Sequence, residues 1–192
     1  WDQALHQPPY QTPPKTPVWF IKPRNTHLAN GGAIPFPAGE TVQSGGTLAV
    51  IIGDTARKVP VEQVSRYLAG YALANDVSLP ESSFYRPAIK AKCRDGFCPL
   101  GEIGQLEAAD RLEIVTEING VEQDRWSTAD LVRSVPELIA AISDFITLQP
   151  GDAVLIGTPH QRVEIKPGDE VTVRAAGLPT LTNRVTQAGA AS

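Results

Sequence analysis

The sequence has 192 residues, of which 42% are hydrophobic and 20% are charged. This composition is typical of one globular domain and excludes a mostly disordered or collagen-like chain. The 17 basic and 21 acidic side chains leave a net charge of −4, and no basic block is present that would attract a nucleic acid or an anionic bilayer. No apolar run approaches the roughly 18 residues of a membrane-spanning helix. We therefore expect neither a nucleic-acid partner nor a membrane partner.

The two cysteines, Cys93 and Cys98, are too few and too close for a zinc site or a disulfide framework. We expect both to be reduced thiols in a cytoplasmic protein. No secretory signal sequence is visible. The sequence starts at Trp1 and contains no methionine, so we expect residues upstream of it.

The first half of the chain alternates proline-rich and apolar segments. Residues 1–17 predict an extended lead-in, because proline disfavours helix. An apolar run at 18–23 predicts a short strand, and the continuous apolar run at 47–53 predicts a strand covered on both faces. Helical spacing of apolar residues predicts a helix over 61–68. Residues 71–77 predict a second buried strand that ends in polar groups.

The second half has stronger turn signals. Alternating apolar and polar residues over 112–118, closed by Asn119-Gly120, predict a β-hairpin. Residues 128–131 and 136–145 predict two short helices, the second with proline in its first turn. Two Pro-Gly-Asp turns each predict a following strand, at 153–156 and at 170–174.

Together these elements predict a strand-rich α+β fold with a few short helices at its edge. We find no internal repeat and no linker. Residues 1–192 are expected to form a single domain, with the lead-in at 1–17 and a frayed tail at 188–192.

Three motifs occur in an order and spacing that resembles the fumarylacetoacetate hydrolase superfamily. They are GYALANDVS at 70–78, KAKCRDGFCPLG at 90–101 and LQPGDAVLIGTP at 148–159. The resemblance runs from about Val18 to Val185. It implies that superfamily's mixed β-sheet roll with short peripheral helices.

Three further segments are similar to one branch of this superfamily: VWFIKPRNT at 18–26, NDVSLPE at 75–81 and FYRPAIKAKCRDGF at 84–97. That branch decarboxylates 5-oxopent-3-ene-1,2,5-tricarboxylate and isomerises 2-hydroxyhepta-2,4-diene-1,7-dioate in 4-hydroxyphenylacetate catabolism. It occurs as a tandem duplication or as two subunits. The resemblance is to the N-terminal copy, or to the separate first subunit, and implies lyase (carboxy-lyase) and isomerase activity on a 2-oxo acid.

The resemblance also implies a metal cofactor, usually Mg²⁺, as the electron sink for the enolate left when carbon dioxide departs. The superfamily holds it with a Glu-x-Glu pair and an aspartate. Asp76 matches the aspartate, but Gly45 and Thr47 stand at the two glutamate positions. One carboxylate makes a weak site for Mg²⁺. We therefore expect a metal-bearing sister domain or subunit, and a homo- or hetero-oligomer.

The resemblance implies catalytic roles for Lys92 and Thr158. Each of these residues, like the metal-ligand candidate Asp76, also has a structural interpretation. Asp76 could bond turn amides at a strand end, Lys92 could form a surface ion pair, and Thr158 could cap the tight turn before Pro159.

Three basic residues are candidates for binding substrate carboxylates: Lys22, Arg86 and Arg94. Lys22 lies beside Pro23, and the two arginines flank the KAKC motif. Solvent-exposed side chains are the alternative for all three.

We expect the chain to be a half or subunit of the decarboxylase and isomerase, with a degenerate metal site. The alternatives are a non-catalytic structural partner of a metal-bearing sister, or another superfamily hydrolase such as an acylpyruvase. Leu79-Pro80-Glu81 departs from the Ala-Arg-Asp ending usual for the last group. The absent glutamates favour the structural partner, and the retained Asp76, Lys92 and Thr158 favour a working pocket.

Overall fold

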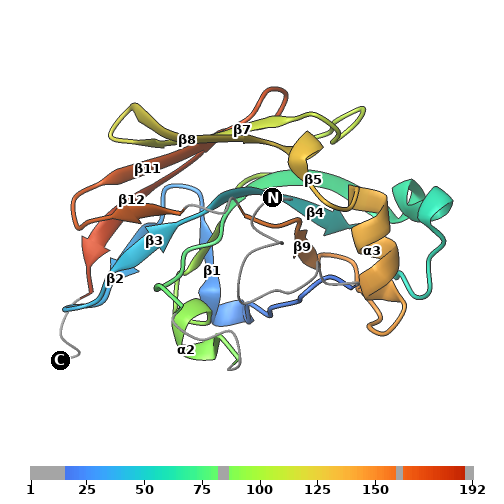
Figure 1. Ribbon diagram of the computed structural model, residues 1–192, viewed down its shortest axis with the longest axis horizontal. Coiled ribbons are helices and arrows are strands. Elements are labelled where there is room, and N and C mark those ends of the chain that lie inside the picture. Colours follow the sequence, from blue (N-terminus) through green and yellow to red (C-terminus); the bar gives the residue numbers. More distant parts are fainter. Residues whose placement is uncertain (1–15, 82–86, 159–161, 189–192) are drawn as a thin grey trace.

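The computed structural model describes residues 16–81, 87–158 and 162–188. Two five-stranded sheets lie face to face, and helix α3 covers one end of the layers (Figure 1). The first sheet has the order β1 (His27–Ala29), β6 (Cys98–Leu100), β5 (Leu68–Asn75), β4 (Gly46–Ile52) and β9 (Ala153–Leu155). The second has the order β2 (Ala33–Phe36), β12 (Leu181–Gln187), β11 (Glu170–Arg174), β7 (Glu113–Ile118) and β8 (Val121–Ser127).

The remaining elements are short. Strands β3 (Val42–Ser44) and β10 (Val163–Ile165) pair with each other. The helices are η1 (Arg24–Thr26), η2 (Val61–Tyr67), α2 (Ile89–Lys92), η3 (Thr128–Asp130) and α3 (Val135–Ser143). None of these helices is long and apolar enough to cross a bilayer, as judged over the described ranges.

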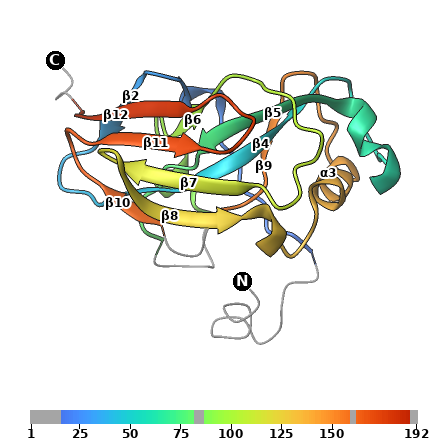
Figure 2. The same ribbon diagram turned by 90° about the horizontal axis from the view of Figure 1, so that it is seen from above.

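Each large sheet is mixed, which confirms the predicted fold class. Strand β1 pairs with β6 in parallel, and β2 pairs with β12 in parallel. The other neighbours within the two sheets are antiparallel. Figure 2 shows the second sheet in front of β4, β5 and β9, with α3 beyond its end.

Strand β4 is the centre of the molecule, because all seven of its residues are buried. Leu48 and Val50 belong to the main core, together with residues of the second sheet and of α3. Ala49 and Ile51 point to the opposite face, where they pack with Ala72. The alternation follows from the period of two in a strand, and it confirms the strand predicted to be covered on both faces.

Helix α3 begins where its sequence directs it to begin. Ser134 caps the helix by accepting a hydrogen bond from the amide of Glu137, and the Glu137 carboxylate accepts from the Ser134 amide. Leu138 and Ile139 are buried in the main core. The helix ends at Ser143, two residues before the predicted end.

Two local predictions need correction. The strand predicted at 18–23 is wrong: this segment pairs with no strand among the described residues, and Pro17 and Pro23 have no amide hydrogen to offer to one. The helix predicted at 61–68 is a 3₁₀ helix over Val61–Tyr67, in which Val64 alone is buried. The predicted lead-in and tail lie largely outside the described residues.

Leu48→Ala tests the central place of β4. The side chain is fully buried between the sheets, and its removal should lower the free energy of unfolding by about 2–5 kcal/mol. Val121→Ala on β8 is the matched control, because Val121 is 60% exposed and should cost less than about 0.5 kcal/mol. Equal losses in urea titrations of the two variants would contradict this core assignment.

Candidate functional site

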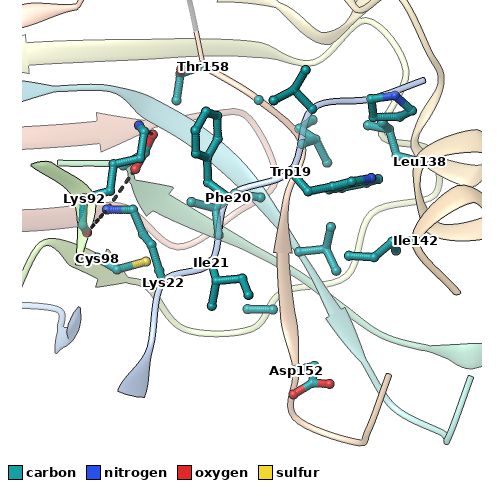
Figure 3. Close-up of a pocket in the computed structure, with 18 of the residues that line it drawn as sticks. Trp19, Phe20, Ile21, Lys22, Lys92, Cys98, Leu138, Ile142, Asp152 and Thr158 are labelled. Carbon is teal, nitrogen blue, oxygen red and sulfur yellow. Dashed lines mark hydrogen bonds and ion pairs between the residues drawn. The ribbon is translucent and has the colours of Figure 1, made fainter. Parts of the chain in front are cut away.

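A cavity of about 670 Å³ is covered by residues 16–22, the strap. The strap crosses over β9 and the face of α3 (Figure 3). One end of the cavity is polar and is lined by Lys22, Asp76, Lys92, Thr158 and Arg162. The other end is mainly apolar, although Arg133 and Asp152 also line the cavity. Trp19 packs there against the main core, on the side of Leu138 and Ile142 (Figure 3).

Asp76 reaches the polar end because it directly follows β5. Its amide donates to the carbonyl of Gly45 at 2.9 Å, which ties the end of β5 to the start of β4. The neighbouring Asn75 makes the turn contacts, because its Oδ1 accepts from the Gly45 amide at 2.9 Å and from the Ser44 hydroxyl at 3.0 Å. The structural alternative considered for Asp76 thus describes Asn75, and the Asp76 carboxylate is left for other partners.

Three cations from separate parts of the chain surround the Asp76 carboxylate. The Lys22 ammonium lies 2.8 Å from Oδ1 and the Lys92 ammonium 3.0 Å from Oδ2. The Arg162 guanidinium pairs with Oδ2 and also donates to the Asp76 carbonyl oxygen. All four side chains are at most 16% exposed. The cluster joins the strap, α2 and the segment before β10.

These charges determine the ionisation of the buried groups. Burial on its own would raise the pKa of the Asp76 carboxyl, but Arg162, Lys22 and Lys92 outweigh it and hold this pKa well below its usual range. Burial lowers the pKa of the Lys22 ammonium, against the opposing effect of Asp76. Asp76 is therefore a carboxylate throughout the physiological range.

The Lys22 ammonium is enclosed by protein oxygen atoms. It donates to the carbonyls of Val77 at 2.8 Å, Phe97 at 2.7 Å and Lys92 at 3.1 Å, besides its contact with Asp76. An ammonium has three hydrogens to donate, so these partners saturate it. The geometry does not support the predicted substrate contact of Lys22 and instead makes this residue the anchor of the strap.

Lys92 is the last residue of α2, and it lines the cavity. Besides Asp76, its ammonium has Glu81 at 3.4 Å and the ring of Phe20 at 5.2 Å from the ring centroid. Figure 3 shows Lys92 and Lys22 on the same side of the cavity, with Phe20 above the strap. The structure thus brings Lys92 to the cavity, in place of the surface ion pair that was its structural alternative.

Thr158 lies at the same polar end, in the segment that follows β9. Its hydroxyl oxygen accepts from Arg162 at 3.1 Å. Thr47 supports this loop, because its hydroxyl donates to the carbonyl of Gly157. The motif LQPGDAVLIGTP at 148–159 predicted Thr158 at the site. It gave no signal for Arg162, which lies beyond its end.

Of the two remaining candidates, Arg94 does not line the polar end. Arg94 lies outside the cavity lining, where it pairs with Glu40 at 3.1 Å and donates to the carbonyl of Lys90. Its predicted substrate contact is not supported by this placement. Arg86 lies outside the described residues, so its predicted role stays a prediction.

Cys98 lines the cavity next to Lys22 (Figure 3). Burial raises the pKa of its thiol to about 11, so it is a neutral group at physiological pH. It contributes a small apolar surface near the polar end, and Cys93 is likewise a free thiol.

The cluster does not fit a divalent metal ion. No group of three or more His, Cys, Asp or Glu that could hold a metal occurs among the described residues. Two unit charges about 4 Å apart interact by about 4 kcal/mol at an effective dielectric constant of about 20. A divalent ion beside Asp76 would therefore meet more repulsion from the three cations than attraction to Asp76 and Glu81 together.

The family of the chain follows from comparison with known proteins. Residues 1–186 match the family model described as fumarylacetoacetate (FAA) hydrolase C-terminal. The chain belongs to this family.

Two comparisons refine the relationship. The chain is 62% identical, over 96% of its length, to the 4-hydroxyphenylacetate degradation bifunctional isomerase/decarboxylase of Escherichia coli, but covers only 43% of that protein. It is 35% identical to the 2-hydroxyhepta-2,4-diene-1,7-dioate isomerase of Mycobacterium marinum, with a TM-score of 0.86 over 92% of this chain and 71% of that one. The chain thus spans less than half the length of its bifunctional relative, and its predicted match to the N-terminal copy stays a prediction.

A third comparison concerns metals. The maleylpyruvate hydrolase of Sphingobium sp. SYK-6 was solved in complex with manganese (II) and pyruvate. It is 29% identical to this chain, with a TM-score of 0.81 over 88% of this chain and 64% of that one. A divalent metal therefore occurs in the family, whereas the residues around Asp76 disfavour one here.

Asp76→Asn tests the charge cluster. Three buried cations would lose their carboxylate, so the free energy of unfolding at pH 7 should fall by about 3–5 kcal/mol. The low pKa of Asp76 in the folded state means that its stabilising effect is full above its unfolded value of about 3.9 and is lost as the pH falls through the lower folded value. Wild type and variant should therefore converge in stability only below about pH 4.

Thermal unfolding at several pH values measures this difference. Asp54→Asn is the control, because Asp54 is exposed and the change should cost less than about 0.5 kcal/mol. A wild-type advantage over Asp76→Asn that disappears already at pH 6 would contradict the low pKa.

Proposed function

We propose that the chain is one half, or one subunit, of a decarboxylase and isomerase that acts on 5-oxopent-3-ene-1,2,5-tricarboxylate and 2-hydroxyhepta-2,4-diene-1,7-dioate. The observation that carries the proposal is the convergence of Lys92, Arg162 and Thr158 at one end of a cavity of about 670 Å³. Such a volume suits a small ligand, and the 62% identity to a bifunctional isomerase/decarboxylase supports the choice of reaction.

The charge of the site suits an unsaturated 2-oxo acid with several carboxylates. The cluster has three cations, Lys22, Lys92 and Arg162, which all pair with Asp76. Glu81 pairs with Lys92 and adds a second carboxylate, so one net positive charge remains. A buried positive charge attracts an anion more strongly than the same charge in water. The apolar remainder of the cavity would receive the carbon chain of the substrate.

The cations also suit the electron flow of decarboxylation. The bond to the leaving carboxyl group breaks, carbon dioxide departs, and the electron pair moves through the conjugated chain onto the keto oxygen as an enolate. Preorganised positive groups stabilise such developing charge. We assign this role to Lys92, with Arg162 beside it, and to the Thr158 hydroxyl we assign a hydrogen bond donated to a substrate oxygen.

We place the Mg²⁺ implied by the family resemblance on a metal-bearing sister copy, because the residues around Asp76 do not fit a divalent ion. The active assembly is then a homo- or hetero-oligomer, or a fused pair. We place it in the cytoplasm, where the free thiols of Cys93 and Cys98 stay reduced.

Turnover assays separate this proposal from its alternatives. The assembly with a metal-bearing sister copy should release carbon dioxide from the tricarboxylate and isomerise the dienoate, whereas the isolated chain with Mg²⁺, which lacks the metal-bearing copy, should not carry out both reactions. Both reactions by the isolated chain would contradict the division of labour, and hydrolysis of an acylpyruvate in place of decarboxylation would assign the chain to the hydrolases.

Lys92→Ala in the assembly tests the active-site role of this chain. Removing a group that stabilises the transition state should lower kcat by about 10²-fold. Lys90→Ala is the matched control, because Lys90 lies two residues earlier on α2 and is exposed; its kcat should stay within about twofold of wild type. Equal rates for the two folded variants would make the chain a structural partner and contradict the proposal.

A further inference from the structure

We infer that Arg162 replaces a metal ion in this chain: its guanidinium supplies positive charge to Asp76, and Gly45 leaves open the space in which it lies. The inference concerns only residues of this chain. It holds whether or not the assembly carries out the proposed reaction.

The space around Gly45 is the first support. A Cβ atom at this residue would lie 3.0 Å from Nη1 of Arg162 and 3.1 Å from Cγ2 of Thr158. Gly45 is not among the residues with positive φ, so the backbone accepts other residues here. The guanidinium therefore lies at the edge of the space that a larger side chain at residue 45 would enter.

The partners of Arg162 are the second support. Its guanidinium contacts three oxygen atoms, namely a carboxylate oxygen and the carbonyl oxygen of Asp76 and the hydroxyl oxygen of Thr158. Carboxylate, carbonyl and hydroxyl oxygens are the kinds of atoms that bind a hard cation. A guanidinium is permanently charged and has five donors in one plane, so it can satisfy the same oxygen atoms without a metal.

Thr47 is the third support, because it stands at the second glutamate position of the family pattern. It is fully buried, and its hydroxyl donates to the carbonyl of Gly157, next to Thr158. A glutamate at residue 47 could not keep this contact. The two residues that stand in place of the glutamates thus have separate effects. Gly45 leaves room for Arg162, and Thr47 holds the backbone next to Thr158.

Mn²⁺ binding, measured by electron paramagnetic resonance without substrate, tests the inference. The wild-type chain and Arg162→Ala alone should bind no Mn²⁺ at about 1 mM, because one carboxylate makes a weak site. Gly45→Glu/Thr47→Glu/Arg162→Ala should bind Mn²⁺ at least about tenfold more tightly than Gly45→Glu/Thr47→Glu, in which Arg162 is retained.

Two results would overturn the inference: micromolar Mn²⁺ binding by the wild-type chain, or equal affinities of the folded double and triple variants. Because this assay uses neither substrate nor a sister copy, failure of the proposed function leaves it intact.

A thermal double-mutant cycle covers the case in which the glutamate variants do not fold. Gly45→Ala should lower the melting temperature by about 2–4 °C in the wild-type background, because the added methyl group would lie 3.0 Å from Nη1 of Arg162 and the guanidinium would have to shift away from its oxygen partners. In the Arg162→Ala background, the decrease in melting temperature caused by Gly45→Ala should be about half as large or less. The control background is Arg184→Ala, which removes an arginine that is 62% exposed on β12 and should leave the shift unchanged. Additive effects of Gly45→Ala and Arg162→Ala would overturn the inference.

Discussion

The buried carboxylate of Asp76 is the interaction on which the site depends. A charge taken out of water is stable only when it is paired, and here it is paired with Lys22, Lys92 and Arg162. These cations come from the strap, from α2 and from the segment before β10. One negative charge thus holds together the segments that enclose the polar end of the cavity, and its position is set by the end of the buried strand β5.

Much of the fold could be predicted from the sequence, because the long strands have clear patterns. The continuous apolar run of β4 and the alternating hairpin of β7 and β8 are found in the structure. Strands of three residues, such as β1 and β6, are too short to show a pattern. The apolar residues at 18–23 resemble a strand in the sequence; in the structure they cover the cavity, and their backbone pairs with no strand among the described residues.

The site could be predicted only in part, because the motifs identify residues but not their partners. Asp76, Lys92 and Thr158 were expected together, and the structure brings them to one end of the cavity. The absence of carboxylates at residues 45 and 47 predicted a weak metal site. That an arginine neutralises Asp76 could not be predicted, because Arg162 reaches Asp76 only through the folding of the loop after β9. Gly45 was the available signal, because it has no side chain where the family pattern has a glutamate.

The central claim is that protein cations, rather than a metal ion, neutralise Asp76. A crystal structure of the chain grown with Mn²⁺, with anomalous data collected near the manganese absorption edge, tests it most directly. The account predicts guanidinium density of Arg162 beside Gly45 and no anomalous peak at the Asp76 carboxylate. An anomalous peak within coordination distance of Asp76, with Arg162 turned away from it, would contradict the account.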